Sequence, residues 1–149
     1  MNKHENYQLL LKQASSLLAG EHDLIANMSN ISALLFSSLP NVSYAGFYRY
    51  QDGELILGPF QGPVACMHIN LGKGVCGTAA ATRQTQIVPD VHQFAGHIAC
   101  DAATNSEIVV PMVKNDQLIA VLDLDSNDFA TFDEVDAEYL AKIAKLVVV

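Results

Sequence analysis

Three cysteines, Cys66, Cys76 and Cys100, are the side chains of this 149-residue chain best suited to covalent chemistry. An odd number of cysteines does not suit a framework of structural disulfides, and the N-terminal residues do not resemble a secretory signal. In a reducing compartment such thiols are buried and inert, bind a metal, or react. The residue types alone leave these three interpretations open.

The surroundings of two of these cysteines favour reactivity. Cys76 lies at the expected start of a helix, where the positive end of the helix dipole lowers the pKa of a thiol. Cys100 lies between His97, which favours the thiolate, and Asp101, which opposes it. Cys66 lies in an apolar segment with a strand-like pattern. Burial of all three as small apolar side chains is the alternative.

A zinc site is a second alternative for the same region. The segments Cys66-x-His68 and His97-x-x-Cys100 together supply two thiols and two imidazoles. Their spacings do not match the C-x₂₋₄-C and H-x₃₋₅-H pairs of common zinc sites. We therefore expect no metal.

Three acidic residues form a second candidate constellation. Asp123 and Asp125 end one expected strand, and Glu107 opens its hairpin partner. Residues two apart on a strand face the same side, so Asp123 and Asp125 are expected to point together. In a pocket, such carboxyl groups could hold an ammonium group, or one with a raised pKa could donate a proton. A solvated strand end is the alternative interpretation.

The elements that must position these residues follow from the hydrophobic periodicity. Apolar spacing predicts two N-terminal helices, then two hairpins with an irregular middle between them, and a last helix. Thr131 and Glu134 form a capping-box pattern that places the start of the last helix at Thr131. The predicted elements are helices over 7–18, 24–39, 75–81 and from 131, and strands over 42–50, 54–60, 85–88, 107–113 and 118–125.

This order indicates an α+β fold, in which the N- and C-terminal helices pack on an antiparallel sheet. The middle stretch, 62–106, carries most of the glycine, histidine and cysteine residues. It is too long for a simple connection, so we expect it to form a lid or a pocket wall.

Composition narrows the classes of partner. The net charge of −8, from 8 basic and 16 acidic residues, offers no basic stripe for nucleic acid. No apolar run approaches the roughly 18 residues of a membrane helix. We therefore expect a cytoplasmic protein that binds neither nucleic acid nor membrane.

Six ordered motifs resemble the free methionine-R-sulfoxide reductases, which are small proteins built on a GAF domain. The three cysteines also keep that family's spacing, with Cys76 ten residues after Cys66 and Cys100 24 residues after Cys76. The resemblance covers nearly the whole chain and implies one GAF-like domain over 1–149. The motifs are Ala45-Gly46-Phe47-Tyr48, Gly58-Pro59-Phe60-Gln61-Gly62, Gly74-Val75-Cys76-Gly77, His97-Ile98-Ala99-Cys100-Asp101, Asn105-Ser106-Glu107-Ile108-Val109-Val110-Pro111 and Leu122-Asp123-Leu124-Asp125-Ser126.

The resemblance also implies roles for individual residues. Cys100 matches the catalytic cysteine, Cys66 the resolving cysteine and Cys76 an accessory thiol. The acidic residues that line the family's substrate pocket match Glu107, Asp123 and Asp125. One position departs from the family, because Tyr44 stands where a tryptophan is usual, which puts substrate affinity in question.

The reaction that the resemblance implies is the reduction of free L-methionine-R-sulfoxide to methionine. A thiolate of Cys100 would attack the sulfoxide sulfur, and the resulting sulfenic acid would condense with Cys66. Thioredoxin would then reduce the disulfide, with no cofactor, and the family suggests a homodimer. The alternative function is a non-catalytic GAF module that senses a small ligand or redox state.

Overall fold

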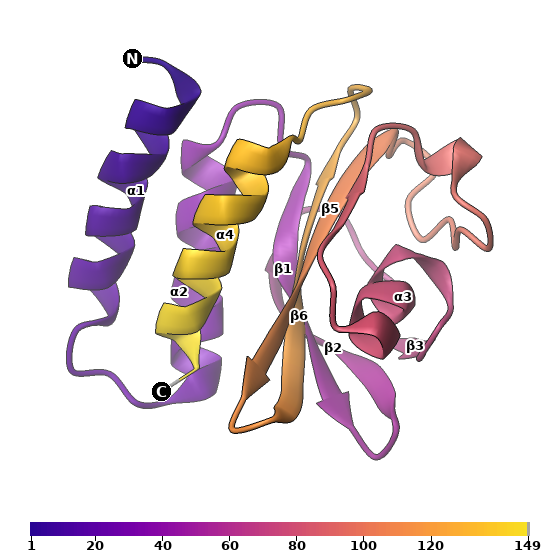
Figure 1. Ribbon diagram of the computed structural model, residues 1–149, viewed down its shortest axis with the longest axis horizontal. Helices are drawn as coiled ribbons and strands as arrows, with labels where there is room; N and C mark the ends of the chain where they lie inside the picture. Colours follow the sequence, from indigo (N-terminus) through magenta and orange to yellow (C-terminus); the bar gives the residue numbers. More distant parts are fainter. Residues whose placement is uncertain (149) are drawn as a thin grey trace.

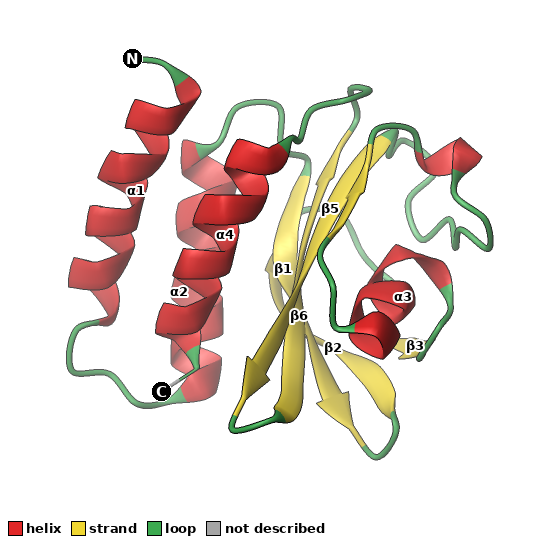
Figure 2. Cartoon of the chain, in the orientation of Figure 1, coloured by secondary structure: helices red, strands yellow, loops and turns green. Residues whose placement is uncertain are grey.

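The computed structural model describes residues 1–148 of the chain, so Val149, the last residue of the expected domain, lies outside it. Its centre is a six-stranded sheet in the order β3-β2-β1-β6-β5-β4, in which every neighbouring pair is antiparallel. Helices cover both faces of this sheet (Figures 1 and 2). The strands are β1 (Tyr44–Gln51), β2 (Glu54–Gln61), β3 (His68–Asn70), β4 (Gln86–Val88), β5 (Ser106–Lys114) and β6 (Gln117–Ser126).

Three long helices lie on one side of the sheet. Helices α2 (Leu24–Ser38) and α4 (Glu134–Val147) pack on the strands, and α1 (Lys3–Leu18) packs against these two helices (Figure 1). The side chain of Asp23 accepts a hydrogen bond from the backbone N–H of Ala26 and caps α2. The prediction of two N-terminal helices and two hairpins is confirmed. The core between these helices and the sheet contains Leu10, Met28, Ile31, Leu35, Phe47, Ile108, Leu122, Leu124, Leu140 and Ile143, among others.

The predicted start of the last helix is wrong by three residues. Helix α4 begins at Glu134, and its N-cap is Asp133, whose side chain accepts hydrogen bonds from the N–H groups of Val135 and Asp136. The capping box is therefore formed by Asp133 and Asp136. Thr131 instead donates its hydroxyl to Ser126 Oγ at 2.7 Å, which ties the preceding loop to β6.

The opposite face of the sheet carries α3 (Gly74–Thr82), the short 3₁₀ helix η1 (Val91–Gln93) and the connecting loops. A second apolar core lies under them, and its members are Tyr48, Leu55, Ile69, Val75, Cys76, Ala79, Ala80, Val88, Val91, Val109, Leu118 and Val121. Helix α3 and strand β4 agree with the sequence prediction. The rest of stretch 62–106 is less irregular than expected, because it also contains the three-residue elements β3 and η1, which the sequence pattern did not reveal.

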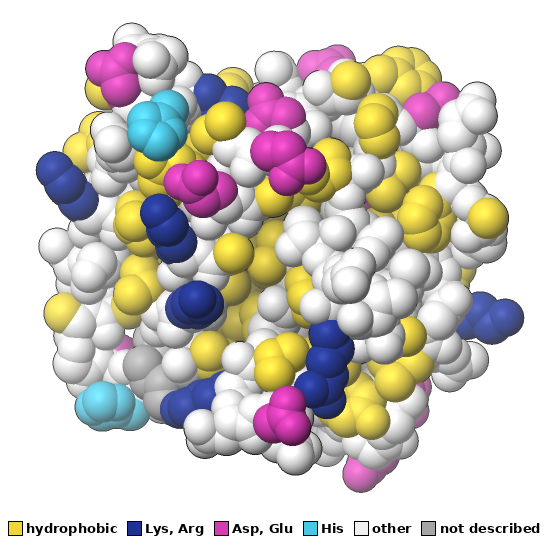
Figure 3. All heavy atoms as spheres, viewed as in Figure 1, with side chains coloured by type: hydrophobic (Ala, Val, Ile, Leu, Met, Phe, Trp, Pro, Cys, Tyr) yellow, Lys and Arg dark blue, Asp and Glu magenta, His cyan; other side chains and the backbone are white. Residues whose placement is uncertain are grey.

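The surface mixes charge types. On the face seen in Figure 3, Lys and Arg side chains are interspersed with Asp and Glu and with apolar groups. Among residues 1–148, no helix has both the length and the apolar character needed to cross a membrane.

Candidate active site

Strand register brings the predicted acidic residues together. Asp125 on β6 lies directly opposite Glu107 on β5, and on its other side it pairs with Tyr44 on β1. Because side chains alternate along a strand, Asp123 and Asp125 share one face of β6, as predicted. That face is the one covered by α3, because Val121 of the same strand belongs to the core beneath α3.

Glu107 and Asp123 are buried and Asp125 is half-buried, so the interpretation as a solvated strand end is wrong. Glu107 is 7% exposed and Asp123 is 4% exposed. Burial, and then the nearby charges of Asp123 and Asp125, raises the pKa of Glu107 well above its usual value. Burial likewise raises the pKa of Asp123, and burial with the charge of Asp123 raises the pKa of Asp125. The three carboxyl groups therefore share protons rather than all carrying charge.

Cys76 lies in the first turn of α3, as predicted, but its thiol is not activated there. Burial, followed by the charges of Asp123 and Glu107, raises the pKa of Cys76. The thiol donates to Glu107 Oε2 at 3.9 Å. The expected lowering of its pKa by the helix dipole is wrong, because desolvation beside carboxyl groups outweighs the dipole of a nine-residue helix.

Close packing of α3 keeps Cys76 in this position. A Cβ atom added at Gly77 would lie 2.4 Å from the carbonyl oxygen of Asn70, so only glycine lets the helix approach the end of β3. The sulfur of Cys76 and one carboxylate oxygen each of Glu107 and Asp123 lie within 4.8 Å of one another. This spacing is close enough for the three groups to surround a single cation.

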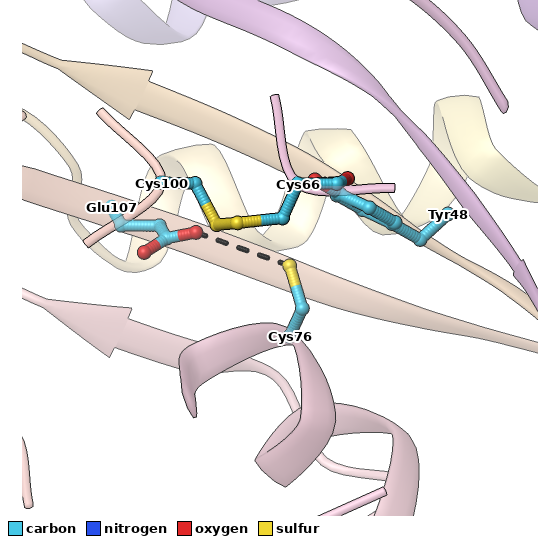
Figure 4. The surroundings of a disulfide bond; sticks show 5 residues. All are labelled: Tyr48, Cys66, Cys76, Cys100 and Glu107. Atoms are coloured by element: carbon cyan, nitrogen blue, oxygen red, sulfur yellow. Dashed lines mark hydrogen bonds between the residues drawn. A yellow bond between two sulfur atoms is a disulfide. The ribbon is translucent and has the colours of Figure 1, made fainter. Parts of the chain in front are cut away.

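Cys66 and Cys100 form a disulfide, with Cα atoms 5.4 Å apart. It joins the loop before β3 to the loop after η1, and the pairing that the family resemblance implied is confirmed. The alternative zinc set is not assembled, because the two sulfurs bond to each other and His68 Nδ1 lies 2.9 Å from Glu54. Figure 4 shows the Glu107 carboxyl group and the Cys76 sulfur pointing toward this disulfide.

His97 does not act as the cation expected beside Cys100. Its pKa is lowered, first by burial and then by the charge of His92, so it favours the neutral ring. It lines the same cavity as Cys100.

Two tyrosines of β1 complete the site. Burial, and then the charge of Asp123, raises the pKa of Tyr44, so its hydroxyl stays protonated. That hydroxyl is buried and has no hydrogen-bond partner among the described residues. Its ring stacks on Phe60, with centroids 5.4 Å apart. The hydroxyl of Tyr48 donates to the carbonyl oxygen of Cys66 at 2.9 Å.

Tyr48 was not among the predicted site residues. It lies four residues after Tyr44, so strand alternation places both rings on the same face, and this spacing is the signal that could have found it.

Six of the seven predicted site residues line one cavity. Its volume is about 40 Å³, room for only a few water molecules. Two carboxylate oxygens, Asp123 Oδ1 and Asp125 Oδ1, are buried there without a hydrogen-bond partner among the described residues. The predicted residues on its wall are Tyr44, Cys76, Cys100, Glu107, Asp123 and Asp125. The seventh predicted residue, Cys66, is not on the wall and is joined to it through its disulfide to Cys100.

Comparison with known proteins places this site in a family. The GAF domain model matches residues 27–149. Free methionine-R-sulfoxide reductase from Escherichia coli is 50% identical over 96% of this chain and 87% of its own length. The enzyme of that name from Saccharomyces cerevisiae is 50% identical over 99% of this chain and 86% of its own.

The chain belongs to the free methionine-R-sulfoxide reductases. It is therefore an oxidoreductase with a GAF fold, as the sequence motifs predicted. A solved structure agrees, the free methionine-R-sulfoxide reductase from Neisseria meningitidis in complex with its substrate. It superposes with a TM-score of 0.95 at 43% identity and covers 99% of this chain and 89% of its own.

Proposed function

We propose that this member of the family reduces free L-methionine-R-sulfoxide to methionine in the cavity beside Cys100. The observation that carries the proposal is a disulfide, Cys66–Cys100, next to a cavity lined by three buried carboxyl groups. A thiol pair supplies two electrons, and the carboxyl groups supply a proton and a negative site for an amino acid.

Asp123 and Asp125 are the groups we assign to the substrate ammonium. Each has a buried oxygen without a hydrogen-bond partner among the described residues, and such an orphaned acceptor is costly unless a ligand donates to it. An ammonium group offers three donors and a positive charge. A methionine sulfoxide within a peptide has no such ammonium group, so the free amino acid is the expected substrate.

Glu107 is the group we assign to proton donation. Its raised pKa keeps the carboxyl group neutral, and a neutral acid can protonate the sulfoxide oxygen as the sulfur is attacked. The Cys76 thiol donates to Oε2 of Glu107, which supports a role for Cys76 in holding this carboxyl group. This is the accessory role that we propose for Cys76.

The two remaining cysteines carry the electrons. The thiolate of Cys100 attacks the sulfoxide sulfur, and the sulfoxide oxygen takes up a proton. The resulting hydroxyl group moves from that sulfur to the Cys100 sulfur as the bond between the two sulfurs breaks, so methionine is released and Cys100 becomes a sulfenic acid. The thiol of Cys66 then attacks this sulfenic acid, so the disulfide forms and water is released. Sulfoxide is reduced by two electrons, and the two thiols are oxidised by two.

We propose thioredoxin as the reductant that restores the thiols, which fits a cytoplasmic, reducing compartment. The cavity of the disulfide form, at about 40 Å³, is too small for an amino acid, which supports reduction before substrate binds. From the family we also expect a single domain over 1–149 and a homodimer, which sedimentation analysis would check.

The test is consumption of free L-methionine-R-sulfoxide with dithiothreitol or thioredoxin as reductant. We expect turnover with the free amino acid and loss of turnover when its amine is acetylated, because acetylation removes the positive charge. Equal activity on the acetylated compound would contradict the assignment of Asp123 and Asp125. Saturable binding without any turnover would instead support the sensor function.

A further inference from the structure

Exposed apolar side chains flank both sulfurs of the disulfide. Val64 is 87% exposed and Met67 is 69% exposed, and they lie two residues before and one residue after Cys66. Ile98, two residues before Cys100, is 39% exposed. We call these three residues the disulfide patch.

The backbone around this patch is held in place. The carbonyl oxygen of Met67 accepts a hydrogen bond from the N–H of Leu57 at 2.9 Å, and that of Cys66 accepts one from Tyr48. On the other side, Ile98 lies against the start of α3, since a Cβ at Gly74 would be 3.3 Å from its Cδ1 atom. The exposed apolar side chains of the patch therefore lie on segments whose backbone is held in place by the rest of the fold.

We propose that the disulfide patch is the docking surface for a protein dithiol reductase of the thioredoxin type. The inference rests on the proposed function, because only a redox cycle requires the disulfide to be reduced. The disulfide at the centre of the patch determines which kind of partner binds there, since the partner must bring a thiolate to the disulfide. Burial of the apolar side chains around the disulfide stabilises the complex with such a partner.

The position of the patch also selects the sulfur that is attacked. Its two most exposed members flank Cys66, so the partner's thiolate attacks Cys66 Sγ. A mixed disulfide forms there, and Cys100 leaves as a thiolate. The partner's second thiolate then attacks its own first sulfur and releases Cys66 as a thiolate, which takes up a proton. The partner is oxidised by two electrons, and the enzyme disulfide is reduced by two.

The first test changes Met67, which does not line the cavity. We expect Met67→Gln to raise the KM for thioredoxin about fivefold to tenfold while leaving dithiothreitol-supported turnover unchanged. Met67→Leu, which keeps an apolar side chain, should retain the original KM. Leu9→Gln is the matched control, because Leu9 is an exposed apolar residue of α1, on the far side of the sheet (Figure 1).

The outcomes separate this proposal from the proposed function. An unchanged KM for thioredoxin in Met67→Gln, with normal dithiothreitol-supported turnover, would overturn the docking surface alone. Loss of turnover in the unaltered enzyme with both reductants would overturn the proposed function.

The second test traps the partner on the oxidised, unaltered enzyme. A thioredoxin variant without its second cysteine should form a mixed disulfide, and peptide mapping should place the bond at Cys66. A bond at Cys100 would overturn the assignment of the attacked sulfur.

Discussion

The hydroxyl of Tyr48 donates a 2.9 Å hydrogen bond to the carbonyl oxygen of Cys66, the residue proposed to resolve the sulfenic acid. Tyr48 is a buried residue of β1, whereas Cys66 lies in a loop outside regular secondary structure. The bond therefore ties a redox-active loop to the centre of the sheet (Figure 4).

Removal of this bond should slow resolution rather than the first chemical step. One hydrogen bond contributes about 1 kcal/mol, so Tyr48→Phe should lengthen the lifetime of the sulfenic acid about fivefold. A sulfenic-acid trapping reagent would measure that lifetime, while the first turnover should still release one equivalent of methionine. Tyr50→Phe, at an exposed tyrosine of the same strand, is the control. An unchanged lifetime would contradict the role of Tyr48.

The two disulfide-forming cysteines should behave differently when each is replaced. Cys100→Ser should abolish reduction and leave the fold intact, because serine is a weak nucleophile toward sulfur. Cys66→Ser should still release one equivalent of methionine but lose recycling by thioredoxin. Rapid-quench measurement of the methionine released would distinguish the two variants. Normal thioredoxin-supported turnover by Cys66→Ser would make Cys76 the resolving cysteine.

The unpartnered hydroxyl of Tyr44 should matter for substrate and not for stability. Because it has no hydrogen-bond partner among the described residues, Tyr44→Phe should not lower the free energy of unfolding. If the hydroxyl donates to the substrate, its loss should raise KM about threefold to tenfold. Steady-state kinetics and urea unfolding would measure both. An unchanged KM would mean that Tyr44 contributes only its aromatic ring to the cavity wall.

The buried carboxyl groups predict how stability depends on pH. A raised pKa means that folded Glu107 keeps a proton that the unfolded chain releases. Its stabilising contribution is therefore complete below its unfolded pKa, about 4.3, and is lost as pH rises through the folded pKa. Relative to Glu107→Gln, the wild-type protein should lose stability with rising pH, by at most about 1.4 kcal/mol per pH unit. Urea unfolding of the disulfide form would measure this, and a pH-independent difference would contradict it.

The sequence by itself determined the elements and the chemistry they carry. Periodicity identified the long helices and both hairpins, because each buries one face over many residues. It also placed Asp123 and Asp125 on one side of their strand, because alternation needs no tertiary information. The pairing of Cys66 with Cys100 came from the family resemblance and not from spacing.

Only the tertiary structure decided the electrostatics of the site. Register across β1, β6 and β5 set Tyr44 and Glu107 on either side of Asp125, and α3 packs over this face. Burial reversed the pKa shift expected for Cys76, because desolvation depends on what covers a group and local sequence does not contain that information. The start of α4 moved from Thr131 for a similar reason, since β6 supplies Thr131 with a different hydrogen-bond partner.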